Sequence, residues 1–203
     1  MATKNSIDSN IPIEISKGGT NATTMATSTG IVKYDGTSLV TSSTAKIDAS
    51  NRYTNTSQPA FLAYKSANSD NVTGNNTLYT VICNTEVYDQ GSNYNNTTGT
   101  FTAPVTGRYH FCAYVRMEEV GATATTTSLL VTTSNRTYFV RTEGGGNSET
   151  VNNRLQIGGC IYADMDASDT VTIAVRVNGK ASDSVDVEGQ STLVTYFSGS
   201  LIC

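Results

Sequence analysis

The sequence is built from short runs of strand-forming residues separated by turn residues, and no window of it shows the period of a helix. Thr170–Val177 alternates most cleanly, because valine or isoleucine holds every odd position. Clusters of Gly, Asn, Asp and Ser lie between the runs, at 91–96, 144–148 and 178–183. Many short strands with turns of this spacing predict an all-β sandwich. The other predicted strands are Pro59–Lys65, Leu78–Cys83, Arg108–Met117, Ser128–Thr133, Arg136–Thr142, Arg154–Ala163 and Ser191–Ile202.

The first 58 residues have a different composition from the rest of the chain. They are poor in large apolar side chains and rich in Thr, Ser, Gly and Asn, so alone they bury too little surface to offset the entropy of ordering. This segment is therefore either a disordered leader or a shaft that acquires a core by intertwining with copies of itself. We expect two parts, a stem at 1–58 and a head at 59–203. Short extended pieces are predicted at Ile11–Ile15, Gly30–Tyr34 and Ser38–Thr41, with turns at Gly18-Gly19, Asp35-Gly36 and Ser50-Asn51.

Two of the predicted strands carry large side chains on both faces. In Arg108–Met117 and in Ser191–Ile202, the second face still holds aromatic, cysteine or branched apolar residues. A strand with one solvated face should be polar at alternate positions, so these strands indicate that another subunit covers the second face. The alternative is that they are scattered exposed apolar residues, which are common. The residues predicted at the subunit contact are Cys112, Tyr114, Val194 and Tyr196.

Charge and residue counts exclude several functional classes. The 13 basic and 17 acidic residues give a net charge of −4 without a basic block, which argues against a nucleic-acid partner. No apolar run is long enough to insert into a membrane, and the N-terminus lacks the pattern of a secretory signal. One histidine leaves few routes to a catalytic triad. We expect no enzyme activity and no cofactor.

The four cysteines form no CxxC motif, so the spacing supports neither a metal site nor a redox site. Buried free thiols are the favoured interpretation, and the disulfide state stays open. The cysteines are Cys83, Cys112, Cys160 and Cys203.

Residues 78–115 carry an ordered set of short motifs: Val-Ile-x-Asn, a glycine turn, Tyr-Asn, Thr-Gly-x-Phe-Thr-Ala-Pro and Gly-x-Tyr-x-Phe. Pro59-Ala60-Phe61 and Phe197-Ser198-Gly199 flank this stretch in the sequence, and Asp169-Thr170-Val171 lies between. The set resembles the complement C1q/TNF-like domain over residues 59–203. The signature positions are Asn84, Gly91, Tyr94, Asn95, Thr98, Gly99, Phe101, Thr102, Ala103, Pro104, Gly107, Tyr109 and Phe111.

The resemblance implies a ten-stranded jelly-roll sandwich that forms a homotrimer through the sheet with the Gly107 strand and the C-terminal strand. It is preceded by an extended, β-rich stem. We expect Gly99 and Gly107 to supply turns, Tyr109 to point into the sandwich, and Gly199 to allow a close approach. Residues 118–155 resemble the family least, and we expect specificity in loops there. Whether an ion lies on the trimer axis stays open.

A second resemblance lies in the N-terminal part. Residues 15–24, Ile-Ser-Lys-Gly-Gly-Thr-Asn-Ala-Thr-Thr, resemble a repeat of bacteriophage tail-fibre proteins, with Asn21 in place of the usual glycine. The two resemblances together indicate a viral fibre whose C-terminal knob binds a host cell-surface receptor or glycan. This implies a virion or extracellular location, with other virion or fibre proteins contacting the N-terminus. The alternatives are a trimerisation cap or surface decoration without a ligand and, third, a polysaccharide-degrading spike.

Candidate chemistry elsewhere in the sequence is sparse. The acidic run around Asp164, Asp166 and Asp169 lacks the spacing of a calcium loop, and the looser one at 183–188 is interpreted in the same way, as a solvated turn. Surface aromatic side chains could stack on sugars. The candidates for ligand contact are Tyr88, Tyr94 and Tyr138.

Overall fold

The computed structural model describes residues 30–37, 39–144 and 152–203. The chain divides into two compact units between Ser57 and Gln58. The all-β prediction is confirmed, because the described residues form strands and turns and include no helix. Accordingly, no helix among them has the length and apolar character needed to span a bilayer. The pieces predicted at Ile11–Ile15 and Gly18-Gly19, and the fibre-like residues 15–24, lie outside the described residues.

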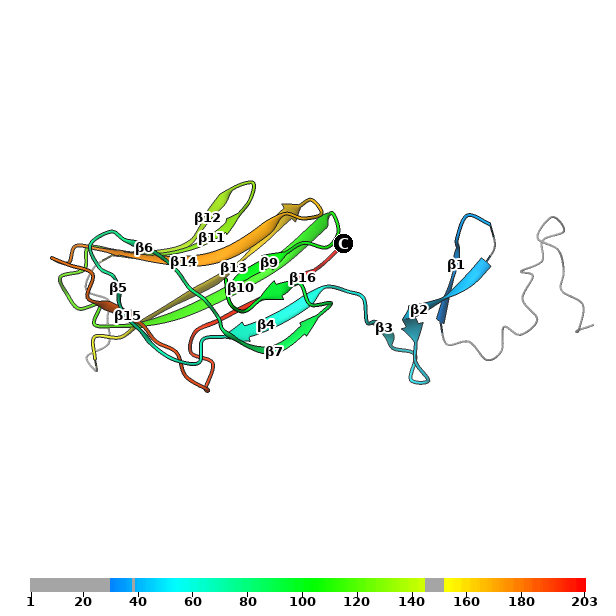
Figure 1. The fold of residues 1–203 in the computed structure, drawn as a ribbon, viewed down its shortest axis with the longest axis horizontal. Helices are drawn as coiled ribbons and strands as arrows, with labels where there is room; N and C mark the ends of the chain where they lie inside the picture. The colour runs from blue at the N-terminus through cyan, green and yellow to red at the C-terminus, as the bar shows by residue number, and fades with distance from the viewer. Residues whose placement is uncertain (1–29, 38, 145–151) are drawn as a thin grey trace, which may run out of the picture. The chain divides into compact units, whose positions relative to one another are not determined.

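The first unit contains one small antiparallel sheet of order β1-β2-β3 (Figure 1). The Asp35-Gly36 turn joins β1 to β2, and the backbone N–H of Thr37 donates to the Asp35 carboxylate. None of the side chains whose burial the structure describes in this unit is buried. The strands are β1 (Gly30–Tyr34), β2 (Leu39–Ile47) and β3 (Tyr53–Asn55).

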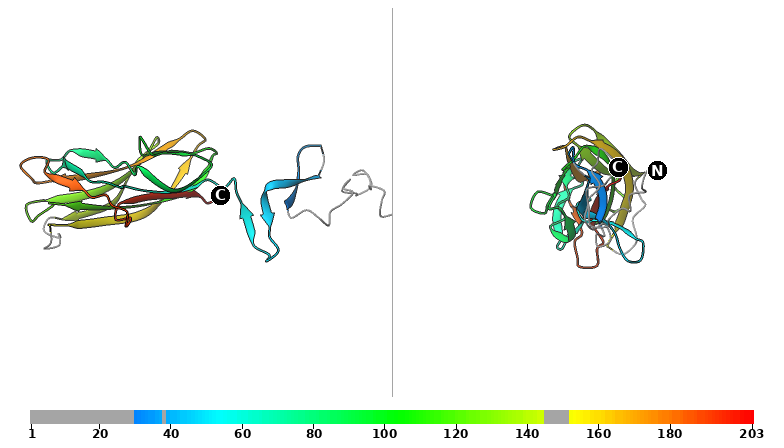
Figure 2. Two further views of the ribbon diagram at one scale, coloured as in Figure 1. Left: turned by 60° about the horizontal axis from the view of Figure 1, so that its bottom comes forward. Right: turned by 90° about the vertical axis from the view of Figure 1, so that its right-hand side faces the viewer.

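The second unit is a sandwich of two sheets that lie face to face (Figures 1 and 2). It contains the strands β4 to β16 rather than the ten that the resemblance implied, because short segments separated by turns and bulges form separate strands. The first sheet contains β5 (Ser69–Thr73), β15 (Val185–Val187), β10 (Gly107–Glu118), β16 (Tyr196–Leu201), β4 (Ala60–Tyr64), β7 (Thr85–Gln90) and β13 (Leu155–Met165). The second contains β12 (Thr137–Gly144), β11 (Thr126–Thr133), β14 (Thr170–Asn178), β9 (Thr100–Thr102), β8 (Tyr94–Asn95) and β6 (Leu78–Thr80).

Strand β10 is the centre of the first sheet. It pairs with β13 along one edge and with β16 and β15 along the other. Its odd-numbered residues from Tyr109 to Met117 are buried, whereas the even-numbered ones from His110 to Glu118 are half-buried. The even-numbered side chains therefore lie on the side of the sheet that faces away from the sandwich, which we call the outer face.

Aromatic rings fill the space between the sheets. Phe61 stacks on Tyr94 and on Phe101, with ring centroids 4.7 Å and 4.9 Å apart, and meets Phe197 edge-on at 5.0 Å. These rings come from strands of both sheets, so the contacts join the two layers. Offset and edge-to-face pairs add to the stabilisation from burial alone. Tyr109 is also fully buried, as predicted.

Three predicted glycine roles have different outcomes. Gly99 adopts φ +71°, which confirms the turn. Gly199 is confirmed as a point of close approach, because a Cβ there would lie 2.6 Å from Cε1 of Phe111. Gly107 was wrongly predicted as a turn. It begins β10, and a Cβ there would lie 2.6 Å from the carbonyl oxygen of Cys203.

The two ends of the second unit's chain lie at the same end of the strands of the first sheet. The side chain of Gln58 donates to the carbonyl of Leu201, and the N–H of Arg108 donates to the carbonyl of Cys203. Because β10 starts beside Cys203, its other end and the loops around it lie at the opposite end of this unit. Within the poorly matching region 118–155, the strands predicted at Ser128–Thr133 and Arg136–Thr142 are confirmed as β11 and β12.

Candidate functional site

The outer face of the first sheet carries a row of tyrosines. Tyr64, Tyr196 and Tyr114 are direct cross-strand neighbours on β4, β16 and β10, and Gly158 on β13 continues the row. The rings of Tyr114 and Tyr196 stack with centroids 5.1 Å apart and planes 20° apart. We call Tyr64, Tyr114 and Tyr196 the tyrosine row. All three are half-buried, so this face offers apolar ring surface where an unpartnered sheet would be polar.

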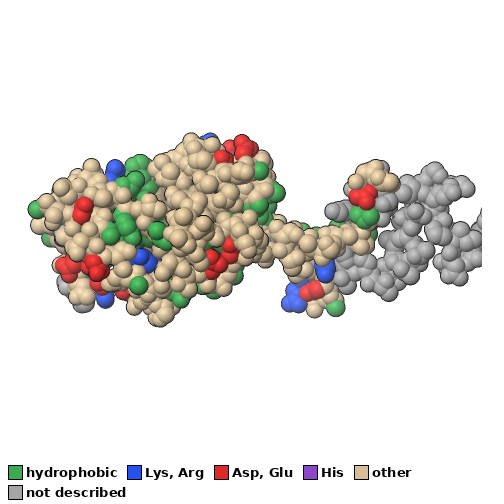
Figure 3. All heavy atoms as spheres, in the orientation of Figure 1, with side chains coloured by type: hydrophobic (Ala, Val, Ile, Leu, Met, Phe, Trp, Pro, Cys, Tyr) green, Lys and Arg blue, Asp and Glu red, His purple; other side chains and the backbone are tan. Residues whose placement is uncertain are grey.

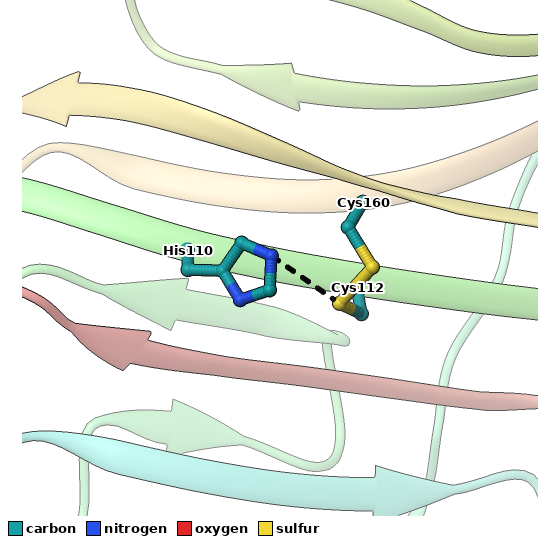
Figure 4. The surroundings of a disulfide bond; sticks show 3 residues. All are labelled: His110, Cys112 and Cys160. Carbon is teal, nitrogen blue, oxygen red and sulfur yellow. Dashed lines mark hydrogen bonds between the residues drawn. A yellow bond between two sulfur atoms is a disulfide. The ribbon is translucent and has the colours of Figure 1, made fainter.

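A disulfide lies next to this row. Cys112 on β10 and Cys160 on β13 are directly opposed, and their sulfur atoms are bonded (Figure 4). The prediction of free thiols is therefore wrong for these two cysteines, which opposed strands bring together across 48 residues of sequence. It is confirmed for Cys83, which is free and buried, whereas Cys203 is free and exposed.

His110 lies beside the disulfide on the same face. Its Nε2 is 3.7 Å from Sγ of Cys112, and a disulfide sulfur can only accept, so Nε2 is the donor. The imidazole also packs on the ring of Tyr162, with centroids 4.8 Å apart. Tyr162 is 71% exposed, which makes it the most exposed large hydrophobic side chain in the described part of the chain.

A group of four charged residues lies at the far end of β10. The Arg116 guanidinium makes two hydrogen bonds to the Glu188 carboxylate, and Nε of Arg154 lies 3.5 Å from Oε2 of Glu188. Arg154 also pairs with Glu118. Glu188 is only 5% exposed, and its hydrogen bond to Arg116 holds the pKa of its carboxyl below the usual 4.5. The prediction that Glu188 lies in a solvated loop is wrong. Glu188 directly follows β15, and the pairing of β15 with β10 places it next to Arg116.

Three of the four residues predicted at the subunit contact lie on the outer face, namely Cys112, Tyr114 and Tyr196. The fourth, Val194, is buried within the chain and offers little surface for such a contact. It precedes β16, and Leu193 has φ +47°, so the alternation of faces does not extend back to it. The structure thus assembles most of the predicted surface and adds Tyr64 and Tyr162, which the sequence patterns did not single out.

The three tyrosines predicted to contact a ligand lie in three different environments. Tyr88 is exposed, as expected. Tyr94 is buried, and its hydroxyl donates to the carbonyl of Cys83, so the prediction of a surface side chain was wrong. Tyr138 is half-buried and packs against the core, whereas its neighbour Phe139 is 60% exposed under the guanidinium of Arg176. The three do not form one site.

The acidic runs serve mainly to hold turns. Asp169 accepts hydrogen bonds from Ser134, Asn135 and the N–H of Asp166, and these bonds hold the pKa of its carboxyl below the usual 3.8. Asp183 accepts hydrogen bonds from the hydroxyl of Thr77 and the N–H of Asn75. These bonds hold the pKa of its carboxyl below the usual 3.8 as well. On the side of the head shown in Figure 3, acidic side chains gather where Figure 1 places β5 and β15.

The outer face thus combines stacked rings, a disulfide and paired charges. Comparison with known proteins gives a family for this part of the chain. The C1q domain profile matches residues 60–202. No protein of curated function matches the chain.

Solved structures with similar shape include three with low sequence identity. The globular domain of zebrafish complement 1qA protein is 22% identical, covers 71% of this chain and 98% of its own, and has a TM-score of 0.49. Murine APRIL at pH 8.5 is 12% identical, with coverages of 71% and 99% and a TM-score of 0.48. Eiger TNF from S. frugiperda is 12% identical, with coverages of 72% and 93% and a TM-score of 0.48.

Proposed function

The chain belongs to the C1q domain family through residues 60–202, and from this membership we propose that it is a non-enzymatic, homotrimeric fibre protein of a virus. In this proposal residues 1–58 form part of an intertwined stem, and residues 59–203 form a knob that binds a host cell-surface receptor or glycan. Domains of this family are typically trimeric and are generally binding modules rather than enzymes.

The observation that carries the trimer is the tyrosine row on the outer face. Contiguous exposed apolar surface marks interaction sites on soluble proteins, and aromatic residues are enriched at subunit interfaces. The first unit also supports a trimer. Its described side chains are all at least partly exposed, including Ile47 and Tyr53, so intertwining with other copies would bury these apolar side chains.

The fibre role is supported by the resemblance of residues 15–24 to a tail-fibre repeat. The proposed ligand surface is the set of loops opposite Gln58 and Cys203, where 119–125 and 179–184 lie. Three such loop sets on one trimer would raise avidity without any new contact in each.

The first test is the absolute mass of the purified chain by light scattering. A trimer would weigh about three times the 21.5 kDa of one chain, and a monomer would contradict the proposal. Tyr114→Glu combined with Tyr196→Glu should convert the trimer into monomers, because like charges would face each other in the contact. Phe139→Glu, which changes an exposed aromatic residue of the other sheet, is the matched control and should leave the mass unchanged.

The second test is binding to host cells and to a glycan array. Loss of binding in variants of 119–125 or 179–184 that still form trimers supports a receptor-binding knob. A trimer that binds neither cells nor glycans would instead be a cap or a surface decoration. Release of reducing sugar ends from a capsular polysaccharide would indicate a degrading spike.

A further inference from the structure

Three metal-binding side chains of one chain meet on the outer face. One ring nitrogen of His110 and the Sγ atoms of Cys112 and Cys160 all lie within 4.8 Å of one another. His110 and Cys112 are two residues apart on β10 and so project from the same face, and Cys160 is the cross-strand neighbour of Cys112 on β13 (Figure 4). Two adjacent, paired strands therefore fix the place of all three donor groups.

Thiolate and imidazole are the ligands that zinc prefers, with bonds of about 2.3 Å to sulfur and about 2.0 Å to nitrogen. In a tetrahedral site these bonds place a nitrogen and a sulfur roughly 3.6 Å apart. The observed distance of 3.7 Å between Nε2 of His110 and Sγ of Cys112 already fits that geometry. The bond between the two sulfur atoms prevents binding, because a disulfide offers no thiolate, and the two sulfur atoms must move apart once the bond is reduced.

We propose that reduction of the Cys112–Cys160 disulfide converts this cluster into a zinc site. Reoxidation by a small-molecule disulfide, which takes up two electrons and two protons and becomes two thiols, restores the Cys112–Cys160 bond and releases the metal. Two equivalents of a thiol reductant supply two electrons and two protons, which yield two cysteine thiols and one disulfide of the reductant. Zinc then displaces both thiol protons and binds the two thiolates and Nε2 of His110, while the imidazole changes tautomer so that its one ring proton lies on Nδ1. The fourth position of the tetrahedron is left for water or an added ligand.

The surroundings suit such a site. Cys160 is exposed in the single chain, so both a small reductant and a metal ion can reach the sulfur. The ring of Tyr162 packs on the imidazole and restricts its rotation. On the other side of β10, Ser198 and Ser200 are the cross-strand neighbours of Cys112 and His110, so the cluster is bordered by small hydroxyl side chains.

This inference goes beyond the proposed function and does not rest on it, because one chain supplies all three ligands. It concerns the face that we propose for subunit contact, so occupancy of the site would also change the charge of that face. The zinc site is tested by the number of metal ions bound per chain, and the trimer is tested by the mass in solution. The two proposals can therefore fail independently.

The test uses the full chain with Cys83→Ala and Cys203→Ser, so that 112 and 160 hold the only cysteines. Oxidised protein and anaerobically reduced protein, cleared of reductant, are titrated with Co²⁺ and with Zn²⁺. We expect one metal ion per reduced chain, with a thiolate-to-cobalt charge-transfer band, and none per oxidised chain. A further Cys112→Ser change should abolish the band, and His110→Gln should weaken binding at least about tenfold. Tyr162→Phe keeps all three ligands and is the matched control.

Mass spectrometry of alkylated samples confirms that both thiols are free, and circular dichroism confirms that the strands persist. If Cys112→Ser does not fold, the comparison of oxidised and reduced protein and the His110→Gln variant still decide the question. A reduced, folded chain that binds no metal overturns the proposal, and so does one that unfolds on reduction. Equal binding by the reduced parent and by His110→Gln also overturns it.

Discussion

Gly158 and Tyr114 fit together across β13 and β10, because the missing side chain of the glycine leaves the space that the tyrosine ring occupies. A Cβ on Gly158 would overlap this ring, with Cε1 only 2.5 Å away. The tyrosine ring thus packs against Gly158 on β13 and also stacks on Tyr196 of β16.

Gly158→Ala should therefore push Tyr114 out of the tyrosine row. We expect the variant to stay folded, since the sandwich core lies on the other face of the sheet, but to lose trimer in favour of monomer at low protein concentration. Light scattering over a dilution series measures this change. Gly144→Ala, where a Cβ meets no atom within 4 Å, is the control and should assemble as the parent does. Unchanged assembly of Gly158→Ala would remove the tyrosine row from the contact.

Gly199→Ala should destabilise the head from the inside. The new Cβ would lie 2.6 Å from Cε1 of Phe111 and 2.8 Å from Cε1 of Phe61, in a core that cannot yield without displacing other rings. Such overpacking costs about 1–3 kcal/mol of unfolding free energy. Denaturant titration followed by tyrosine fluorescence gives the value, again with Gly144→Ala as the control. If Gly199→Ala lowers the unfolding free energy no more than Gly144→Ala does, the prediction is wrong, and the rings of Phe111 and Phe61 can move to make room for the new Cβ.

Glu188→Gln tests the buried ion pair with Arg116. Because the folded pKa of Glu188 is lowered, the pair stabilises the fold above the unfolded pKa near 4.5, and this contribution is lost as the pH falls through the folded pKa. At pH 7 we expect a loss of about 3 kcal/mol, since the largely buried Arg116 guanidinium loses the charged carboxylate with which it makes two hydrogen bonds. Below pH 4.5 the difference between parent and variant should shrink, which thermal unfolding across pH measures. A difference that does not vary with pH would contradict the prediction.

The cysteines should differ sharply in reactivity. Cys203 is exposed, whereas burial raises the pKa of the Cys83 thiol to about 12, so Cys83 stays protonated and shielded in the folded chain. Alkylation followed by intact mass should give one adduct on the native chain, two after unfolding, and four after unfolding with reduction. Four adducts without reduction would show that the Cys112–Cys160 bond is absent.

The sequence predicted those features that depend on the alternation of side chains within a single strand. The alternation in Arg108–Met117 identified β10 and its two faces, and Tyr109 lies in the core as predicted. Tyr114 and Tyr196 were placed on the outer face for the same reason, because each strand shows its parity directly in the sequence.

The errors arose where pairing between distant strands decides the outcome. Cys112 meets Cys160 only through the register of β10 with β13, which no spacing motif encodes. Glu188 meets Arg116 because β15 pairs with the end of β10, although its neighbours in sequence resemble a solvated turn. Tyr94 follows polar loop residues but turns inward to stack on Phe61. A list of aromatic residues in polar segments cannot distinguish such a ring from an exposed one such as Tyr162.

The arrangement of Gln58 and Cys203 at one end of the head has a practical consequence for protein engineering. A reporter protein or affinity tag appended after Cys203 would emerge beside the point where the chain enters the head, and would leave the loops of the opposite end unobstructed. Libraries in which 119–125 and 179–184 are randomised could thus be displayed from either chain end of the same scaffold.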